Sequence, residues 1–283
     1  MKTLKSFLIT FVILGATLFY VSRPPSLTNE TYVPIDGGIL IAHAGGGHEA
    51  GTYSNTKEAM DLAVANGFTY IELDFTQVKN GDWVLMHDWN KTHLRYFSQF
   101  PNFPPILANL LNPIPETAKD FKARKMRFNL TPLTLDDTAR WLKHHPNIRI
   151  ITDVKGDNIE GLQAIKLALG NKTNQIIPQI YSPEEYSAVK SIGYSNIIFT
   201  AYRSSMGLND IVEFCQSHDL FALTIPKGWL SENTLKSLSS IQTPLFTHTV
   251  NAPNNLNAYK QNGVDGFYTD YLTPISSREK PPL

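Results

Sequence analysis

The sequence is poor in cysteine and has no excess of either charge. Cys215 is the single cysteine among 283 residues, which excludes an internal disulfide framework and a cysteine-rich metal site. Basic and acidic residues number 25 each, so the formal net charge is zero. Because a nucleic-acid-binding domain needs a basic patch or stripe, this balance indicates that nucleic acid is not a partner.

Long apolar runs are also scarce. One uncharged run covers residues 7–21, between two N-terminal lysines and a segment that contains a Pro-Pro pair. It is shorter than the ~20 residues of a typical spanning helix, so residues 1–22 are predicted to form either a signal peptide or a membrane anchor. The lysines before the run predict that the rest of the chain lies outside the cytoplasm, in the periplasm or cell envelope. Residues 23–36 are predicted to be a linker.

Apolar segments of β type alternate with amphipathic helical segments after this linker. Such alternation is typical of a parallel sheet, because the crossover between two parallel strands usually contains a helix. Eight strands are predicted, at residues 38–43, 69–76, 148–154, 175–181, 196–200, 221–225, 245–250 and 266–269. Helices are predicted at residues 56–66, 134–145, 158–169, 183–191, 207–218, 231–239 and 253–262. Eight such units predict one (β/α)8 TIM barrel over residues 37–275, followed by a tail at 276–283.

Residues 88–132 interrupt the alternation of strands and helices. This stretch is rich in proline, asparagine and aromatic residues. A long irregular insertion in a barrel usually covers the active site or makes contacts outside the domain. Because it begins directly after His87, we expect a lid or a wall of the substrate site, with a packed surface excursion as the alternative.

Two carboxylates lie two residues apart in the second predicted strand. Side chains alternate between the faces of a strand, so Glu72 and Asp74 project to the same side. Asn80-Gly81 between two β-rich runs predicts a hairpin extension, and with this pair as the turn His87 lies opposite Asp74. Burying two carboxylates together is costly unless a proton or cation lies between them, and a hard divalent cation fits best.

Other chemistry-bearing residues fall at the ends of predicted strands. The carboxyl ends of the strands are where a barrel of this kind places its active site. The first strand ends in His43 and a glycine-rich segment with Gly45, whose backbone can approach an anion closely. The third strand gives Asp153 and Lys155 on one face. The remaining strand ends contribute Arg203, Lys227, His248 and Asn251.

Three carboxylates, two histidines and a lysine form a set suited to phosphoryl transfer. A divalent cation held by Glu72, Asp74 and Asp153 would polarise a phosphate oxygen. One histidine would accept the proton of the nucleophile, and the other would protonate the leaving alcohol. Lys155 would balance the charge on the equatorial oxygens. The further candidates for binding the phosphate are Gly45, Arg203 and Lys227.

Several short motifs occur together between about residues 38 and 272. They are His43 with Gly45, Asn55-Thr56, Glu72-Leu73-Asp74, Asn80-Gly81, His87-Asp88, Asp153-Val154-Lys155, residues 247–251 and residues 263–270. In this combination the sequence resembles the glycerophosphodiester phosphodiesterases, within the superfamily of phospholipase-C-like barrel phosphodiesterases. The resemblance implies Ca²⁺ or Mg²⁺ on Glu72, Asp74 and Asp153, with His43 and His87 as the acid–base pair. It also implies that a neighbouring hydroxyl of the substrate attacks the phosphorus, giving a cyclic phosphate that water opens.

The sequence departs from the pattern of that family at a few positions. Ala44 stands where the family typically has arginine, and Ser54 stands where it has glutamate. Their joint absence indicates that a phosphate-binding ion pair is missing, with His48 or Glu49 as candidates to replace it. His248 stands where the family commonly has tryptophan. These departures predict a divergent member that acts on a different phosphodiester.

The leading prediction is an exported or membrane-anchored metal-dependent phosphodiesterase, that is, a phosphoric diester hydrolase. Its substrate would be a glycerophosphodiester, a lipid headgroup or an envelope polymer with glycerol phosphate. The alternatives are phospholipase C activity on phosphatidylinositol-type lipids and a non-catalytic module that binds a phosphodiester polymer. Bacterial phosphatidylinositol phospholipases use no metal, so the acidic cluster favours the metal-dependent branch. A glycosidase is disfavoured because Glu72 and Asp74 on one strand are too close together to flank a sugar bond.

Overall fold

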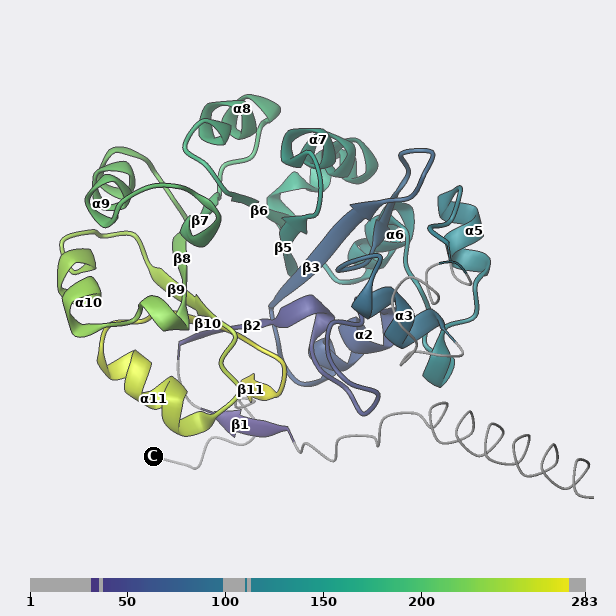
Figure 1. Cartoon of the computed structure of the whole chain (residues 1–283), viewed down its shortest axis with the longest axis horizontal. Helices are drawn as coiled ribbons and strands as arrows, with labels where there is room; N and C mark the ends of the chain where they lie inside the picture. Colours follow the sequence, from purple (N-terminus) through teal and green to yellow (C-terminus); the bar gives the residue numbers. More distant parts are fainter. Residues whose placement is uncertain (1–31, 36–37, 99–109, 111–112, 275–283) are drawn as a thin grey trace, which may run out of the picture.

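Eight parallel strands close into a barrel with helices around it (Figure 1). The structure, a computed structural model, describes residues 32–35, 38–98, 110 and 113–274. The barrel strands are β2 (Ile39–Ala42), β3 (Tyr70–Gln77), β5 (Arg149–Val154), β6 (Ile176–Ile180), β7 (Ile198–Thr200), β8 (Ala222–Pro226), β9 (Leu245–His248) and β10 (Gly266–Thr269). Strand β2 pairs with both β3 and β10, which closes the ring. The predicted TIM barrel and its eight strands are therefore confirmed.

Helices cover the outside of the barrel at the predicted positions. They are α2 (Lys57–Ala65), α6 (Leu135–His144), α7 (Asn158–Leu169), α8 (Glu185–Ile192), α9 (Leu208–Ser217), α10 (Glu232–Leu238) and α11 (Pro253–Gln261). Side-chain caps fix several of their starts. At α6 the Thr134 hydroxyl accepts from the Asp137 N–H, and the Asp137 carboxylate accepts from the Thr134 N–H. This capping box satisfies two N–H groups that have no partner within the helix.

The inside of the barrel is filled with apolar side chains. One buried cluster there comprises Ile41, Ile151, Ile177, Ile198, Ala222, Phe246 and Tyr268, while a larger cluster lies between the strands and the helices. A Cβ at Gly266 would lie 2.4 Å from the Phe246 ring, so β10 requires glycine where it passes this layer. Because the interior is packed, the ends of the strands are left to form a site.

A β-hairpin extends β3, but its register differs from the prediction. Strand β4 (Trp83–Leu85) pairs antiparallel with β3. The Val78 N–H donates to the Asp82 carbonyl at 3.0 Å, which leaves Lys79, Asn80 and Gly81 as a three-residue loop. The turn is therefore one residue longer than an Asn-Gly pair, and Gly81, with a φ of 90°, ends it. The prediction that His87 lies opposite Asp74 is therefore wrong by one residue, since the Asp74 carbonyl accepts from the N–H of Met86. His87, beyond the end of β4, still reaches the cavity described below.

The chain enters the barrel through a strand that was not predicted. Within the predicted linker 23–36, residues 33–35 form β1 (Val33–Ile35), which pairs in parallel with β11 (Leu272–Pro274). The predicted signal peptide or anchor at 1–22 and the tail at 276–283 lie outside the described residues. Within the described ranges, no helix is long and apolar enough to cross a membrane.

The insertion at 88–132 packs against the hairpin. It contains α3 (Lys91–Phe97), α5 (Ala118–Ala123) and a short 3₁₀ turn, and residues 99–109 and 111–112 lie outside the described part. The Tyr96 hydroxyl donates to the Thr52 carbonyl at 2.6 Å, which joins the insertion to the loop after β2. None of its described residues lines the cavity below, so a role as a lid or wall stays a prediction.

Candidate active site at the carboxyl ends of the strands

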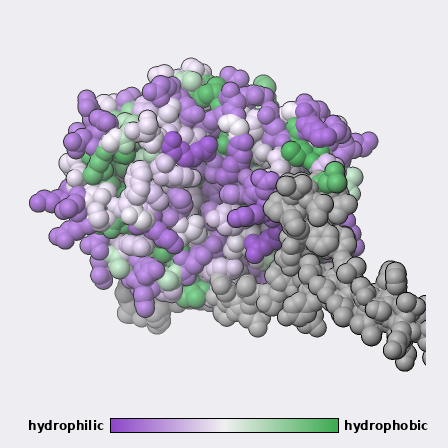
Figure 2. Space-filling model, viewed as in Figure 1, coloured by the Kyte–Doolittle hydropathy of each residue, from purple (hydrophilic) through white to green (hydrophobic). Residues whose placement is uncertain are grey.

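A cavity of about 120 Å³ opens at the carboxyl ends of the barrel strands. Viewed along the barrel axis, the molecule is hollowed near its centre, among mainly hydrophilic residues (Figure 2). The cavity is lined by His43, Tyr53, Glu72, Asp74, His87, Asp153, Lys155, Gln179, Tyr202, Thr224, His248 and Tyr268. The structure therefore brings together the three predicted metal ligands, the two predicted acid–base histidines and the predicted lysine.

Three buried carboxylates form a cluster on β3 and β5. Asp74 lies opposite Asp153 in the register of these strands, and Glu72 lies two residues earlier in β3. One oxygen from each carboxylate lies within 4.8 Å of the others. Glu72 Oε2 accepts from the Ala44 N–H at 2.7 Å, whereas its buried Oε1 has no partner among the described residues. Converging oxygen donors with one unpaired and buried oxygen fit a hard divalent cation.

Lys155 supplies positive charge to this acid cluster. Its Nζ lies 2.8 Å from Asp74 Oδ1 and 2.6 Å from Asp153 Oδ2. Burial by itself lowers the pKa of Lys155, but the charges of the acids outweigh burial and raise the pKa above its ordinary value. For the Glu72 carboxyl, burial and then the charge of Asp74 raise the pKa. Lys155 contacts Asp74 and Asp153, whereas no lysine or arginine among the described residues forms an ion pair with Glu72.

His43 is held by a carboxylate to which the sequence analysis assigned no role. It begins the 3₁₀ turn η1 (His43–Gly45), and its Nδ1 lies 2.9 Å from Asp270 Oδ1. Burial by itself lowers the pKa of His43, but the hydrogen bond with Asp270 and the charge of Glu72 raise it to about 9. Asp270 in turn accepts from Asn251 Nδ2 at 2.8 Å. Because Nδ1 is engaged, Nε2 is the ring nitrogen available for proton transfer.

His87 forms a second histidine–carboxylate pair. Its Nδ1 lies 2.9 Å from Asp88 Oδ2. The Asp88 carboxylate also accepts from the hydroxyl and N–H of Thr92 and from the N–H of Asn90. Burial by itself raises the pKa of Asp88, but these hydrogen bonds lower it well below its usual range. Asp88 therefore stays ionised and orients the His87 ring, which again leaves Nε2 available.

The ring of Tyr53 lies between the two histidines. Its centroid is 4.6 Å from that of His43 and 4.8 Å from that of His87, and both contacts are edge-on. Tyr53 has a φ of 62°, a backbone conformation that residues other than glycine rarely adopt. Sequence reasoning gave this residue no role. The available signal was its place directly before Ser54, one of the departures from the family pattern.

Asn55 fixes Asp74 through two hydrogen bonds. Its Nδ2 donates to Asp74 Oδ2 at 2.7 Å, and its Oδ1 accepts from the Asp74 N–H at 2.9 Å. Asn55 is also left-handed, with a φ of 52°, which asparagine tolerates better than most residues. Its neighbour Ser54, at the position of the family glutamate, is buried with its hydroxyl 3.1 Å from that of Thr56. The loop after β2 thus positions a predicted metal ligand.

Two predicted phosphate-binding residues lie beside the cavity and not in its wall. Arg203 Nη1 is 3.5 Å from Asp153 Oδ1, and its guanidinium lies 3.9 Å from the centre of the Tyr181 ring. Lys227 Nζ donates to the Thr249 carbonyl at 3.3 Å. Both residues belong to 3₁₀ turns that follow barrel strands, η4 (Ala201–Arg203) and η5 (Lys227–Trp229).

The glycine-rich loop after β2 uses its N–H groups to support the His43 pair. Gly46 donates to the His43 carbonyl and Gly47 to the Asp270 carbonyl, each at 2.8 Å. A Cβ at Gly47 would lie 2.6 Å from the Asp270 carbonyl oxygen, so this close approach requires glycine. Gly45, the predicted phosphate contact, has a φ of 88° and is buried outside the cavity wall.

Two further histidines differ in their relation to the cavity. His48 is buried outside the cavity wall, its Nδ1 accepts from the Ala50 N–H at 3.1 Å, and burial lowers its pKa to about 4. Glu49, the other candidate to replace the missing ion pair, is exposed. His248 lines the cavity beside Tyr202, with ring centroids 4.9 Å apart. Its Nε2 has no partner among the described residues, and burial lowers its pKa to about 4.

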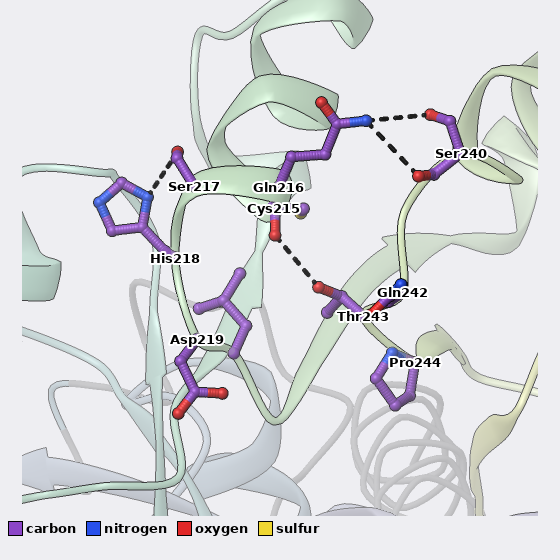
Figure 3. Close-up of a pocket in the computed structure, with 10 residues that line it drawn as sticks. Cys215, Gln216, Ser217, His218, Asp219, Ser240, Gln242, Thr243 and Pro244 are labelled. Atoms are coloured by element: carbon purple, nitrogen blue, oxygen red, sulfur yellow. Dashed lines mark hydrogen bonds between the residues drawn. The ribbon is translucent and has the colours of Figure 1, made fainter.

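A larger cleft, of about 670 Å³, lies at the opposite end of the barrel, between the segments that precede β8 and β9 (Figure 3). The Gln216 side-chain amide donates to the Ser240 hydroxyl at 3.4 Å, and the Thr243 hydroxyl donates to the Cys215 carbonyl at 3.4 Å. Burial raises the pKa of the Cys215 thiol to about 12, so this sulfur is not a reactive thiolate. The acidic cluster and both histidine–carboxylate pairs thus lie away from this cleft.

Fold and site together define a class of protein. It is a (β/α)8 barrel with a buried carboxylate cluster, a lysine and two histidine–carboxylate pairs at the carboxyl ends of its strands. No model of a protein family matches the sequence. Glycerophosphodiester phosphodiesterase 1 of Homo sapiens is 30% identical over 158 residues, which cover 53% of this chain and 42% of that protein. The chain thus spans less than half the length of this curated relative.

Solved structures of similar proteins share the fold over most of their length. A glycerophosphoryl diester phosphodiesterase from Parabacteroides distasonis has a TM-score of 0.62 at 12% identity, covering 93% of this chain and 95% of that chain. A phosphodiesterase from Oleispira antarctica, in complex with the product sn-glycerol-3-phosphate, has a TM-score of 0.57 at 15% identity, covering 82% and 92%. These comparisons confirm the resemblance to glycerophosphodiester phosphodiesterases that the motifs indicate.

Proposed function

We propose that this chain is a metal-dependent phosphodiesterase that hydrolyses a glycerophosphodiester-like substrate, with His43 and His87 as the acid–base pair. The proposal rests on the chemistry of one cavity, in which three carboxylates, two histidines and a lysine face the same small volume. The similarity to glycerophosphodiester phosphodiesterases supports the same reaction class. The product bound to the Oleispira antarctica phosphodiesterase supports a substrate with a glycerol phosphate group.

The unpaired Oε1 of Glu72 is the observation that carries the proposal. A buried oxygen without a partner is costly, and burial beside a second carboxylate adds to the cost. Ca²⁺ or Mg²⁺ on Glu72, Asp74 and Asp153 would relieve both costs, because these ions prefer oxygen ligands. When bound, such a cation polarises a phosphoryl oxygen and offsets developing negative charge.

Residues of this chain would bind the phosphate, transfer the protons and orient the two imidazole rings. Lys155, already in contact with two acids, would bind the phosphate beside the cation and offset charge on its oxygens. One histidine would accept the proton of the attacking hydroxyl, which belongs to the substrate or to water. The other would donate a proton to the oxygen of the leaving alcohol as the P–O bond breaks. Asp270 and Asp88 would keep both rings oriented with Nε2 toward the substrate.

The composition of the N-terminal segment supports a proposal for the cellular location of the protein and for a membrane as its partner. We propose that residues 1–22 export the chain or anchor it in a membrane, with the barrel in the periplasm or cell envelope. A membrane tether would favour a substrate at the lipid surface, through its effective concentration there. The phosphodiester would then be a lipid headgroup or an envelope component.

The test is hydrolysis of glycerophosphocholine and bis(p-nitrophenyl) phosphate by the full chain, with EDTA, Mg²⁺ or Ca²⁺. We expect metal-dependent turnover. His43→Ala and His87→Ala should each lower it at least about 100-fold and leave cation affinity nearly unchanged. His144→Ala, on an exposed residue of α6, is the matched control and should match the wild type. Turnover like that of the wild type in either site variant would refute the acid–base assignment. Cation binding without any turnover would favour a binding module.

A further inference from the structure

An apolar groove lies beside the candidate active site. It has a volume of about 300 Å³ and is lined by Met206, Leu208, Ile211, Gly228, Trp229, Ser231 and Thr234. Trp229 is 38% exposed, while Ile211 is buried in the floor of the groove. This volume is at the small end of ligand pockets, so the groove suits a narrow apolar group.

The groove and the acid cavity have no lining residue in common, but residues close in sequence line the two. Tyr202, in η4, lines the acid cavity, and Met206, four residues later, lines the groove. Trp229 ends η5, the turn that begins with Lys227. A molecule with a phosphate at the acid cavity therefore has an apolar surface within reach, and two cations, Arg203 and Lys227, lie on the turns between the two.

The chain also enters the barrel at this end. The Tyr32 hydroxyl donates to the Gly47 carbonyl, and the Val33 N–H donates to the Tyr271 carbonyl at 3.2 Å. Both partners adjoin the loops that hold His43 and Asp270, so Tyr32 marks the rim of the active site. The apolar run 7–21 lies only residues 22–31 further back, which span at most ~35 Å when fully extended.

We propose that the groove binds the acyl chain of a single-chain glycerophospholipid whose phosphodiester enters the acid cavity. This inference rests on the proposed function and names its substrate class: an acylated glycerophosphodiester taken from a lipid surface. Removal of each buried methylene from water is favourable, so the groove raises affinity for an acylated substrate over glycerophosphocholine. A tether attached at the rim would keep the mouth of the barrel near the surface that holds such lipids. Trp229 and Tyr202, each 38% exposed at this end, are side chains suited to a membrane–water interface.

The test measures kcat/KM of the full chain for glycerophosphocholine and for its acylated forms with chains of increasing, still monomeric, length. We expect kcat/KM to rise with chain length and then to level off as the groove fills. Trp229→Ser and Met206→Glu should lower the ratio of acylated to unacylated kcat/KM about tenfold. Leu167→Ser changes an apolar side chain on α7 that is 84% exposed and does not line the groove, so it should leave the ratio unchanged. Both values of kcat/KM in the ratio come from the same variant, so a lower fraction of folded protein reduces them equally and leaves the ratio unchanged.

The outcomes separate this inference from the proposed function. Metal-dependent hydrolysis of glycerophosphocholine with no effect of chain length would refute acyl-chain binding in the groove. The same result would support the proposed phosphodiesterase function. A second readout needs no turnover: an acyl glycerophosphocholine with a brominated chain should quench tryptophan fluorescence in the wild type. Trp229→Phe keeps the groove apolar and removes the reporter, so quenching should largely disappear. Unchanged quenching in this variant would place the chain elsewhere and overturn the inference.

Discussion

Asp270 holds His43 across the seam that closes the barrel. Thr269 lies opposite Ala42 in the pairing of β10 with β2, so the residues that follow each strand end meet although they are far apart in the sequence. Their side chains approach to 2.9 Å. The position of one candidate catalytic imidazole therefore depends on closure of the whole barrel.

Replacing Asp270 with asparagine should lower the pKa of His43, which is raised to about 9 in the cation-free site by the Asp270 hydrogen bond and the neighbouring acids. The imidazolium is stabilised by this carboxylate, so its loss favours the neutral ring. We expect Asp270→Asn to lower kcat at least about tenfold and to move the His43 limb of the pH–rate profile to lower pH. The profile is measured at saturating cation.

The control for this prediction is Asp219→Asn, which changes an exposed aspartate at the opposite end of the barrel. It should leave both kcat and the pH profile unchanged. A profile of Asp270→Asn that superimposes on that of the wild type, at a lower kcat, would indicate a packing role for Asp270 and no electrostatic one.

Glu72→Gln should make the cation-free fold more stable and weaken cation binding. The raised pKa of Glu72 means that its ionisation destabilises the fold as pH rises above the unfolded value near 4.5. A neutral amide removes that repulsion but also removes a ligand charge. At neutral pH we expect a higher melting temperature in EDTA, and an affinity for Ca²⁺ or Mg²⁺ lower by about tenfold or more by calorimetry. Glu213→Gln, on the exposed face of α9, should change neither quantity.

The sequence predicted the barrel strands well, and it predicted that the three carboxylates of this site lie close together. Their role as cation ligands stays a prediction. Alternation along β3 places Glu72 and Asp74 on one face, and the parallel pairing of β3 with β5 brings Asp153 opposite Asp74. The hairpin register failed because it depends on loop length, which the three-residue turn at Gly81 sets. The roles of Asp270 and Tyr53 could not be predicted, because they arise from loops that meet only after the barrel closes.

The capping box of α6 should contribute to the free energy of unfolding in a way that depends on pH. Burial by itself raises the pKa of Asp137, but hydrogen bonds from Lys122, Thr134 and Arg140 outweigh it and lower the pKa to about 2. Since the unfolded value is near 4, this carboxylate stabilises the fold fully above about pH 4, and its contribution is lost as pH falls toward 2. We expect Asp137→Asn to lose about 1 kcal/mol or less at pH 7, because the two cations are half exposed.

Denaturant unfolding at several pH values checks this prediction. The difference between wild type and Asp137→Asn should shrink between about pH 4 and pH 2. Asp136→Asn changes an exposed carboxylate in the same helical turn and is the matched control. A pH-independent difference for Asp137→Asn would show that its cost comes from geometry and not from the charge of the carboxylate.

Tyr53 should act on catalysis through the two imidazoles that its ring touches. Tyr53→Phe keeps both edge-on contacts, so we expect kcat within about threefold of the wild type. Tyr53→Gly removes the ring and also relieves the left-handed backbone, so the fold should remain stable while the imidazoles lose their common neighbour. Two edge-on contacts worth about 1 kcal/mol each predict a fall in kcat of about tenfold or more, with cation affinity unchanged. The measurement pairs steady-state kinetics with cation titration. If Tyr53→Gly turned over as fast as the wild type, the ring would serve only to fill space between the histidines.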